Sequence, residues 1–219
     1  MKKYLSASVM CADLVNLEKS IRELEKGGID YIHIDIMDGS FVPNITLGFD
    51  LVNAVKKITD IPLDVHMMVS DPARFIDLMN LDENDILCVH YEADVHIQRT
   101  LAKIKAKGCK AGLAVNPQTP LFAFEYLREY VDMALIMTVS PGFAGQKIFE
   151  GAERKIREAR AMLGNDILIE ADGNMSIPNG VMASNAGADI FVLGTSSLFL
   201  KDKDIETAAK DFRAALSEG

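Results

Sequence analysis

Cysteine is scarce in this chain of 219 residues, and the three that occur form no recognisable pair. Cys11, Cys88 and Cys109 lie far apart and include no Cys-x-x-Cys motif, which argues against a disulfide framework and for a reducing compartment. Long hydrophobic runs are also missing, because polar residues such as Ser6 and Asp13 interrupt the apolar stretch after the basic N-terminus. We therefore expect a cytoplasmic protein without a signal peptide or a membrane span.

Positive charge is in deficit, since 23 Lys and Arg face 32 Asp and Glu and give a formal net charge of −9. A nucleic-acid backbone or an acidic membrane surface requires a basic patch, so we expect neither as a partner. The chain also lacks a G-x-S-x-G elbow, a P-loop and a G-x-G-x-x-G turn, which argues against the mechanisms that depend on them. A small anionic substrate stays compatible if local backbone N–H groups hold it.

Short apolar runs alternate with amphipathic stretches along the whole chain. Helical spacing is clear in Asp13–Lys26, which Gly27-Gly28 closes, and in Glu153–Leu163. Asp71-Pro72 predicts the start of another helix, with an N-cap followed by proline at the first position. The eight predicted strands are Leu5–Val9, Tyr31–Met37, Leu63–Met68, Ile86–His90, Ala111–Val115, Met133–Val139, Ile167–Ala171 and Ile190–Leu193.

This alternation predicts a parallel sheet in an α/β protein. Eight strands, each followed by a helix, fit a (β/α)₈ TIM barrel in a single domain over residues 1–219, whereas an open doubly wound sheet rarely needs eight parallel strands here. In such a barrel the active site lies at the C-terminal ends of the strands. None of the predicted strands contains lysine, so a Schiff-base aldolase of this fold has no obvious nucleophile.

Histidine and aspartate occur near the C-terminal ends of three predicted strands. His33 and Asp35 share one face of their strand because side chains alternate, His66 lies in the next strand, and Asp172 follows a third. Four ionisable groups that point into one barrel mouth are costly to bury unless they share a cation, so the set predicts a divalent transition-metal site. The alternative is that each residue is a hydrogen-bonded structural group.

Further polar and sulfur-containing side chains are expected inside the barrel. Asp64 and Glu170 lie one layer deeper, where they either accept hydrogen bonds from imidazole N–H groups or simply fill the interior. The methionines at or near strand ends are Met10, Met37, Met68 and Met137. These methionines serve either as core filler or as a dry wall over a reacting carbon.

Three late segments are rich in small residues: Ser140–Gln146, Asp172–Ser176 and Gly194–Ser196. Small residues let backbone N–H groups approach an anion, and the loops after the last two strands of a TIM barrel commonly bind phosphate. The alternative is that the glycines only permit the turns. Three such segments on neighbouring strands predict a phosphate-binding site.

Several of these segments together resemble the ribulose-phosphate 3-epimerase family. The motifs that carry the resemblance are His33–Gly39, Phe41–Asn44, Leu63–Met68, Met137–Phe143 and Asp172-Gly173. The resemblance extends from Ser6 to about Phe199. It implies a metal-dependent isomerase of carbohydrate metabolism that acts on a small-molecule ketose phosphate. We also expect a homo-oligomer, whose size the sequence does not give.

The resemblance also implies roles for individual residues. One divalent metal ion, most often zinc with iron, cobalt, manganese or magnesium as alternatives, would be held by His33, Asp35, His66 and Asp172. Asp35 and Asp172 would be the acid/base pair that inverts C3 through a metal-stabilised enediolate. The implied substrate-binding residues are Ser8, Met37, Met68, Met137, Gly142, Phe143, Ala144, Gly145, Gln146, Gly173, Asn174, Gly194 and Thr195.

A few residues depart from the common five-carbon pattern of the family. Ala7, Ser40, Ala144 and Asn174 replace more usual residues, and the chain looks more like the D-allulose-6-phosphate 3-epimerase branch. We therefore expect conversion of D-allulose 6-phosphate to D-fructose 6-phosphate, with D-ribulose 5-phosphate to D-xylulose 5-phosphate as the alternative. The residues are also compatible with a different metal-dependent isomerase or lyase of this fold and with a phosphosugar-binding regulatory protein.

Overall fold

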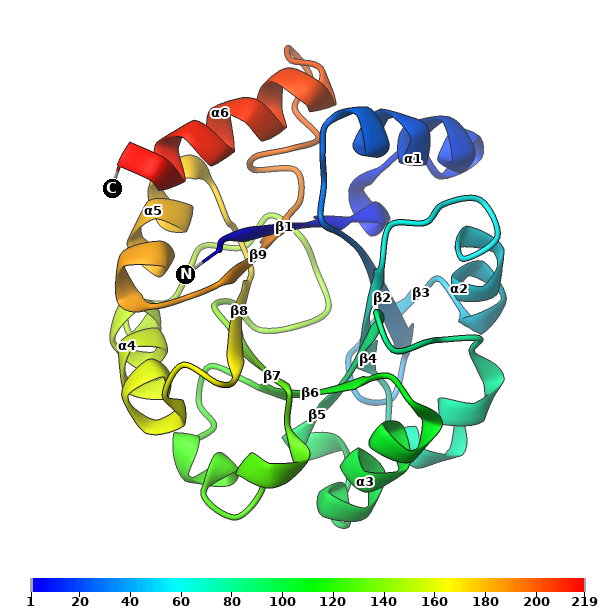
Figure 1. Ribbon diagram of the computed structural model, residues 1–219, viewed down its shortest axis with the longest axis vertical. Helices are drawn as coiled ribbons and strands as arrows, with labels where there is room; N and C mark the ends of the chain where they lie inside the picture. Colours follow the sequence, from blue (N-terminus) through cyan, green and yellow to red (C-terminus); the bar gives the residue numbers. More distant parts are fainter. Residues whose placement is uncertain (1, 219) are drawn as a thin grey trace.

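Eight parallel strands close into a barrel in the computed structural model, which describes residues 2–218 (Figure 1). They are β1 (Tyr4–Ser8), β2 (Tyr31–Asp38), β4 (Leu63–Met68), β5 (Ile86–His90), β6 (Lys110–Val115), β7 (Met133–Met137), β8 (Leu168–Asp172) and β9 (Ile190–Leu193). Because β1 pairs with both β9 and β2, the ring of strands is closed and the barrel has no free edge. The predicted TIM barrel is confirmed, with strand ends within two residues of those expected.

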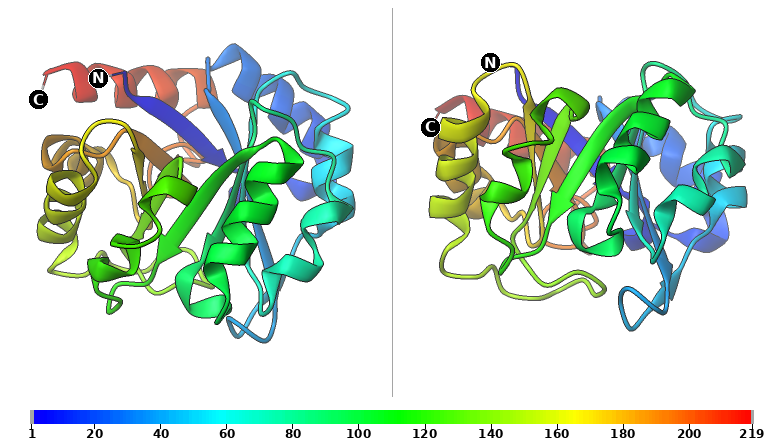
Figure 2. Two further views of the ribbon diagram at one scale, coloured as in Figure 1. Left: turned by 60° about the horizontal axis from the view of Figure 1, so that its bottom comes forward. Right: turned by 90° about the horizontal axis from the view of Figure 1, so that it is seen from below.

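Helices cover the outside of this barrel, as the two side views show (Figure 2). They are α1 (Leu17–Lys26), α2 (Phe49–Val55), α3 (Ile97–Lys107), α4 (Ala152–Leu163), α5 (Ile177–Ala186) and α6 (Ile205–Glu218). Apolar side chains on their inner faces, such as Ile21 and Leu24 of α1 and Ile156 and Ala159 of α4, are buried against the sheet. No helix among the described residues has the length and hydropathy needed to cross a lipid bilayer.

Two predicted helices differ from the structure. Asp71 has a left-handed backbone (φ 52°) and its side chain makes no capping hydrogen bond, and residues 72–78 form only two single 3₁₀ turns. Asp13 does cap, because its carboxylate accepts a hydrogen bond from the backbone N–H of Val15, but the turn it opens is 3₁₀ and α1 begins only at Leu17. The chain between β6 and β7 also contains 3₁₀ turns in place of a helix.

A short strand absent from the prediction, β3 (Ile45–Thr46), pairs antiparallel with the end of β2. Two residues carry too little alternation to be recognised in the sequence. The hydroxyl of Thr46 donates a hydrogen bond of 2.9 Å to the backbone carbonyl of Asp35. The hairpin therefore braces β2 at the point where its side chains enter the barrel mouth.

Alternation along β2 explains how polar groups reach the barrel interior. Ile32, Ile34 and Ile36 belong to the apolar core outside the sheet, whereas His33 and Asp35 point inward. Adjacent parallel strands then fix the depth of each side chain, since Asp35 is in register with His66 on β4. Both faces of the sheet are buried, and only the inner face carries the candidate chemistry.

Candidate active site

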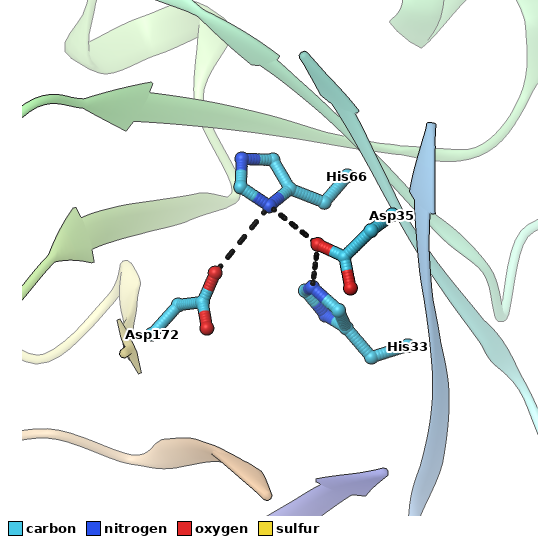
Figure 3. Close-up of side chains that lie close together, drawn as sticks. All are labelled: His33, Asp35, His66 and Asp172. Carbon is cyan, nitrogen blue, oxygen red and sulfur yellow. Dashed lines mark ion pairs between the residues drawn. The ribbon is translucent and has the colours of Figure 1, made fainter. Parts of the chain in front are cut away.

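Four side chains from three strands converge at the C-terminal end of the barrel (Figure 3). Oδ1 of Asp35 lies 3.3 Å from Nε2 of His33 and 3.4 Å from Nδ1 of His66, and Oδ2 of Asp172 lies 3.5 Å from that same Nδ1. One ligand atom from each residue lies within 4.8 Å of all the others. The structure thus brings together the four residues that the sequence suggested as a metal site.

The donor set fits a divalent transition metal. Nε2 of His33 and Nδ1 of His66 are buried and have no hydrogen-bond partner among the described residues, although both face carboxylate oxygens. Two ligand atoms about 2.1 Å from a tetrahedral ion lie about 3.4 Å apart, which matches the three N···O separations of 3.3, 3.4 and 3.5 Å given above. Two imidazoles and two carboxylates suit zinc, iron, cobalt or manganese better than magnesium, which prefers oxygen ligands alone.

A carboxylate below the site orients His33. Oδ2 of Asp64 lies 2.6 Å from Nδ1 of His33 and accepts a hydrogen bond of 2.7 Å from the hydroxyl of Ser6. This contact places an N–H on Nδ1 and directs Nε2 toward Asp35. Burial alone would lower the pKa of His33, but the carboxylates of Asp64 and Asp35 outweigh it and raise that pKa well above its ordinary value. The sequence left two roles open for Asp64, an acceptor for an imidazole N–H group or a filler of the barrel interior. The structure places it as the acceptor.

Glu170 lies at the same depth, fully buried, with no hydrogen-bond partner for either oxygen among residues 2–218. Burial and the neighbouring Asp64 carboxylate raise the pKa of Glu170 well above its ordinary value. Oε1 of Glu170 is 3.9 Å from Nδ1 of His33, too far for a hydrogen bond. Burial and the Asp64 carboxylate thus both favour the protonated form of Glu170.

The two aspartates are held in different ways. Asp35 accepts a hydrogen bond of 2.7 Å from Ser8, and the imidazoles of His33 and His66 outweigh the effect of burial and hold the pKa of Asp35 well below its ordinary value. Asp172 is fixed through its backbone, because the hydroxyl of Thr138 donates to the carbonyl oxygens of Asp172 and Gly173 at 2.8 and 2.6 Å. The side chain of Asp172 is 16% exposed, against 7% for Asp35, so it reaches further into the mouth.

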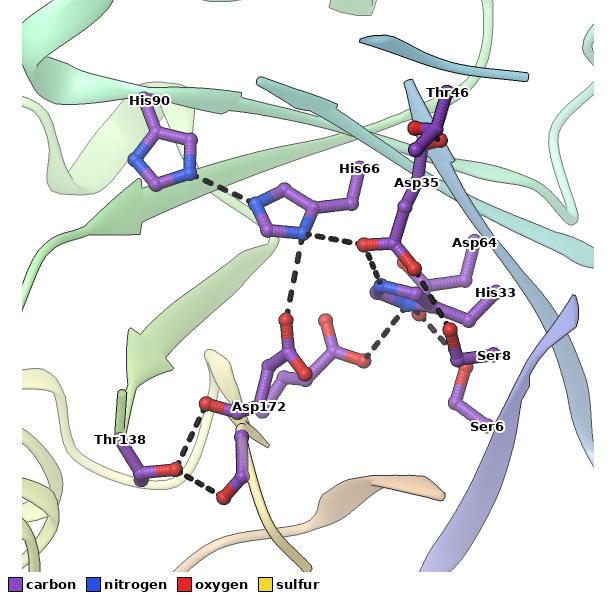
Figure 4. Close-up of polar contacts among 12 residues, drawn as sticks. Ser6, Ser8, His33, Asp35, Thr46, Asp64, His66, His90, Thr138 and Asp172 are labelled. Atoms are coloured by element: carbon purple, nitrogen blue, oxygen red, sulfur yellow. Dashed lines mark hydrogen bonds and ion pairs between the residues drawn. The ribbon is translucent and has the colours of Figure 1, made fainter. Parts of the chain in front are cut away.

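His66 has a second partner that the sequence analysis did not identify. Its Nε2 lies 2.8 Å from Nε2 of His90 (Figure 4). Nδ1 of His90 in turn lies 3.3 Å from Oε2 of Glu92. His90 ends the predicted strand Ile86–His90, at the same end of the barrel as the candidate site. That position is the one signal that could have revealed it.

A cavity of about 260 Å³ opens above the four residues at the barrel mouth. All thirteen substrate-binding residues implied by the resemblance line it: Ser8, Met37, Met68, Met137, Gly142, Phe143, Ala144, Gly145, Gln146, Gly173, Asn174, Gly194 and Thr195. Asp35 and Asp172 line it too, whereas His33 and His66 lie beneath. Cys11 and Val192, which the sequence analysis did not suggest, complete the wall.

The small-residue segments form one side of this cavity. Side chains pin the loop after β7, because Asn44 donates to the carbonyl of Gly142 and Asn174 to that of Gln146, both at 2.7 Å. Among the described residues, the backbone N–H groups of residues 142–146 and of Gly173 donate no hydrogen bond. Gly173 requires its glycine, since φ is +119° and a Cβ would lie 2.6 Å from Val139. Unpaired donors beside a cavity suit an anion such as phosphate.

Comparison with known proteins gives a consistent result. The profile of the ribulose-phosphate 3 epimerase family matches residues 4–199. The chain is 43% identical to a ribulose-phosphate 3-epimerase of Bacillus subtilis over 88% of this chain and 90% of that protein. It is 40% identical to one of Methanocaldococcus jannaschii over 98% of this chain and 91% of that protein. A chloroplastic ribulose-5-phosphate-3-epimerase of Arabidopsis thaliana is 40% identical over 90% of this chain and 72% of its own length.

Similar solved structures support the fold. One is KGPDC from Streptococcus mutans, with a TM-score of 0.72, 13% identity and coverage of 99% of this chain and 98% of that one. Another is thiamine phosphate pyrophosphorylase from Pyrococcus furiosus, with a TM-score of 0.65, 16% identity and coverage of 99% and 96%. The expectation of a six-carbon substrate is not supported, because these curated relatives are named for ribulose phosphate.

Proposed function

The chain belongs to the ribulose-phosphate 3-epimerase family, and from this we infer that it interconverts D-ribulose 5-phosphate and D-xylulose 5-phosphate. The observation that carries the proposal is the position of two carboxylates around one point: Asp35 and Asp172 both lie within 3.5 Å of Nδ1 of His66, one from β2 and one from β8. Epimerisation needs such a pair, because one group must remove a proton from a carbon and another must return one to the opposite face.

Asp35 and Asp172 are proposed as that acid/base pair. The hydrogen on C3 of a 2-ketose is adjacent to a carbonyl, so its removal gives an enediolate. One aspartate takes the proton from C3 and the other delivers a proton to the other face, which inverts the configuration without a redox cofactor. Ser8 keeps the carboxylate of Asp35 in a fixed orientation for this transfer.

His33, Asp35, His66 and Asp172 are proposed to hold one divalent metal ion. When bound, this ion supplies Lewis-acid stabilisation of the negative charge that develops on the sugar oxygens. Asp64 and His90 hold the two imidazoles in position.

The remaining residues bind and enclose the sugar phosphate. Met37, Met68 and Met137 form an apolar wall of the cavity, and exclusion of water there strengthens electrostatic interactions with the substrate. Residues 142–146 and Gly173 also line the cavity, their backbone N–H groups have no acceptor among the described residues, and the phosphate is proposed to bind there.

A direct assay tests this function and its substrate. The zinc-loaded protein is given D-ribulose 5-phosphate or D-allulose 6-phosphate, and kcat/KM is measured for each by following product formation by NMR in D₂O. We expect the five-carbon substrate to be preferred at least about tenfold, a difference of about 1.4 kcal/mol in transition-state binding, with deuterium incorporated at C3.

The outcomes separate the alternatives. Preference for D-allulose 6-phosphate would contradict the substrate and keep the reaction, whereas cleavage of a carbon–carbon bond would indicate a lyase. Binding of either sugar phosphate without turnover would indicate a regulatory protein. Asp166→Asn serves as the matched control for substitutions of the two site aspartates, since that carboxylate is 93% exposed and does not line the cavity.

A further inference from the structure

A row of three polar side chains, His66, His90 and Glu92, leads away from the candidate metal site. Figure 4 shows the first two of them. His66 on β4 contacts His90 on β5, with 2.8 Å between the two Nε2 atoms, and Nδ1 of His90 lies 3.3 Å from Oε2 of Glu92. Both histidines are fully buried, and the side chain of Glu92 is 22% exposed. None of these contacts is needed merely to close the barrel, because β4 and β5 already pair through their backbones.

The far end of this row is fixed by hydrogen-bond donors. Oε1 of Glu92 accepts a hydrogen bond of 2.9 Å from the backbone N–H of Asn116 and another from the hydroxyl of Thr119. The ammonium group of Lys155 holds that loop in turn, because it donates to the carbonyls of Asn116 and Thr119 at 2.5 and 2.8 Å. Glu92 therefore presents its other oxygen, Oε2, to His90 as an acceptor.

Donor and acceptor roles along the row follow from this end. Because Oε2 of Glu92 accepts, Nδ1 of His90 carries the proton, and a neutral imidazole then has an acceptor at Nε2. Two Nε2 atoms 2.8 Å apart share a single proton, and a neutral His90 whose own proton lies on Nδ1 can only accept it. Nε2 of His66 must therefore be the donor to His90. The proton of His66 then lies on Nε2, and Nδ1, which faces Asp35 and Asp172, keeps a lone pair for a cation.

We propose that His90 and Glu92 are positioning residues that fix the tautomer of His66 so that Nδ1 is available as a metal ligand. The inference rests on the proposed function, since it concerns the same metal site. His90 and Glu92 are not ligands themselves. They affect metal affinity through the two hydrogen bonds that link Glu92 to His90 and His90 to His66. Asp64 fixes the tautomer of His33 in the same way. Each imidazole ligand thus has a hydrogen-bond partner that a carboxylate either supplies or orients.

Glu92→Gln is the variant that separates this role from simple packing. The backbone N–H of Asn116 can only donate, so the new amide keeps its oxygen on that side and turns its NH₂ group toward His90. Nδ1 of His90 must then accept, its Nε2 becomes the donor, and Nε2 of His66 must accept. The proton of His66 moves to Nδ1, the atom that faces the metal site. An isosteric change outside the site thus reverses every donor in the row.

The experiment measures zinc affinity by competition with a chromophoric chelator, independently of activity. We expect Glu92→Gln and His90→Leu to weaken zinc binding about 10- to 100-fold, the usual effect of removing the hydrogen-bond partner of a metal-bound histidine. His90→Gln retains one acceptor and one donor and is expected to restore most of the affinity. Thr119→Val is the matched control: it removes a hydrogen bond to the same carboxylate but leaves the donor order intact, so zinc affinity should not change.

Ring ¹⁵N NMR reads the tautomer directly, and the chain has only four histidines, of which His96 is exposed and serves as a reference. In the zinc-loaded wild type, the proton of His66 is expected on Nε2 and that of His90 on Nδ1. Circular dichroism and thermal unfolding establish that each variant folds. Equal zinc affinity of the wild type and Glu92→Gln, or a proton on Nε2 of His90, would overturn the inference. A wild type that does not bind zinc would instead overturn the proposed metal site.

Discussion

The hydroxyl of Ser8 donates a hydrogen bond of 2.7 Å to Oδ2 of Asp35, so the two oxygens of this carboxylate have different partners. Oδ1 is left facing both imidazoles of the candidate metal site, at 3.3 and 3.4 Å. A carboxylate that is anchored at one oxygen loses its rotational freedom, so the other oxygen keeps one orientation. Strand β1 thus contributes to the site without supplying a ligand.

Ser8→Ala is therefore expected to lower kcat while the protein still folds. The variant loses a hydrogen bond to an ionised group. The free energy of such a bond is large enough to lower kcat about tenfold when it is lost. Steady-state kinetics with D-ribulose 5-phosphate measure the effect. Ser217→Ala, on the exposed face of α6, is the control. Unchanged kcat in Ser8→Ala would contradict an orienting role for Ser8.

Replacement of either proposed acid/base residue should remove turnover. Asp35→Asn and Asp172→Asn each keep the size of the side chain but cannot exchange a proton in the same way, and general acid–base catalysis contributes about 10²- to 10⁴-fold to rate. Turnover is measured with zinc content determined on the same samples, because both residues also belong to the metal set. Substantial activity in either purified variant would contradict the assignment of roles.

Much of the fold was readable because the barrel strands are short apolar runs bounded by turns. The alternation in Tyr31–Asp38 distinguishes the inward His33 and Asp35 from the outward isoleucines, and it is visible in the sequence. The helix expected after Asp71 was wrong because tertiary contacts decide that segment: the backbone N–H of Asp71 donates to the carbonyl of Ala93, and the residue takes a left-handed conformation. Local capping preferences carry no information on such a contact.

Some residues of the candidate site could likewise be predicted from the sequence, and others could not. Residues that lie at the ends of strands, such as His66 and Asp172, were predictable because a parallel barrel brings all its strand ends to one rim. His90 was overlooked because a histidine at the end of an apolar run is equally compatible with the core. Asn44 was noted only as part of the motif Phe41–Asn44, and its contact with Gly142 could not be predicted, since it joins residues 98 positions apart and leaves no local pattern.

Removal of the metal should lower thermal stability as well as activity. Four ionisable groups are close together in the barrel mouth, and a cation that binds only the folded state stabilises it. At a free zinc concentration of 100 Kd the gain is about 2.7 kcal/mol, which raises Tm by roughly 5–10 °C in a domain of this size. Differential scanning calorimetry with and without a chelator measures the shift. The absence of any shift with zinc would count against the metal site.

His90 should make the metal-free protein less stable in mild acid. Burial lowers the pKa of His90 to about 4 in the folded state, against an ordinary value of 6.5. Between these values the unfolded chain binds a proton at His90 and the folded one does not, so the free energy of unfolding falls as pH decreases from 6.5 to 4. Well above pH 6.5 the ring is neutral in both states and this contribution is constant.

His90→Gln isolates that contribution because it removes the titrating ring. Urea denaturation of the chelator-treated wild type and variant is compared at several values between about pH 7 and pH 4, the interval that spans both pKa values of His90. The wild type is expected to lose stability relative to His90→Gln as the pH decreases. Parallel curves over the whole interval would show that His90 does not titrate in this way.

The register between β2 and β4 sets a limit on how this chain can diverge. Asp35 faces His66 and His33 faces Asp64 across one hydrogen-bonded ladder, so the spacing of the chemical groups is the spacing of the backbone itself. Shifting β4 by a single residue would turn His66 and Asp64 outward under the helices. Outer helices and connecting turns can therefore gain or lose residues over evolutionary time. In β2 and β4, by contrast, individual residues can be substituted, but none can be inserted or deleted.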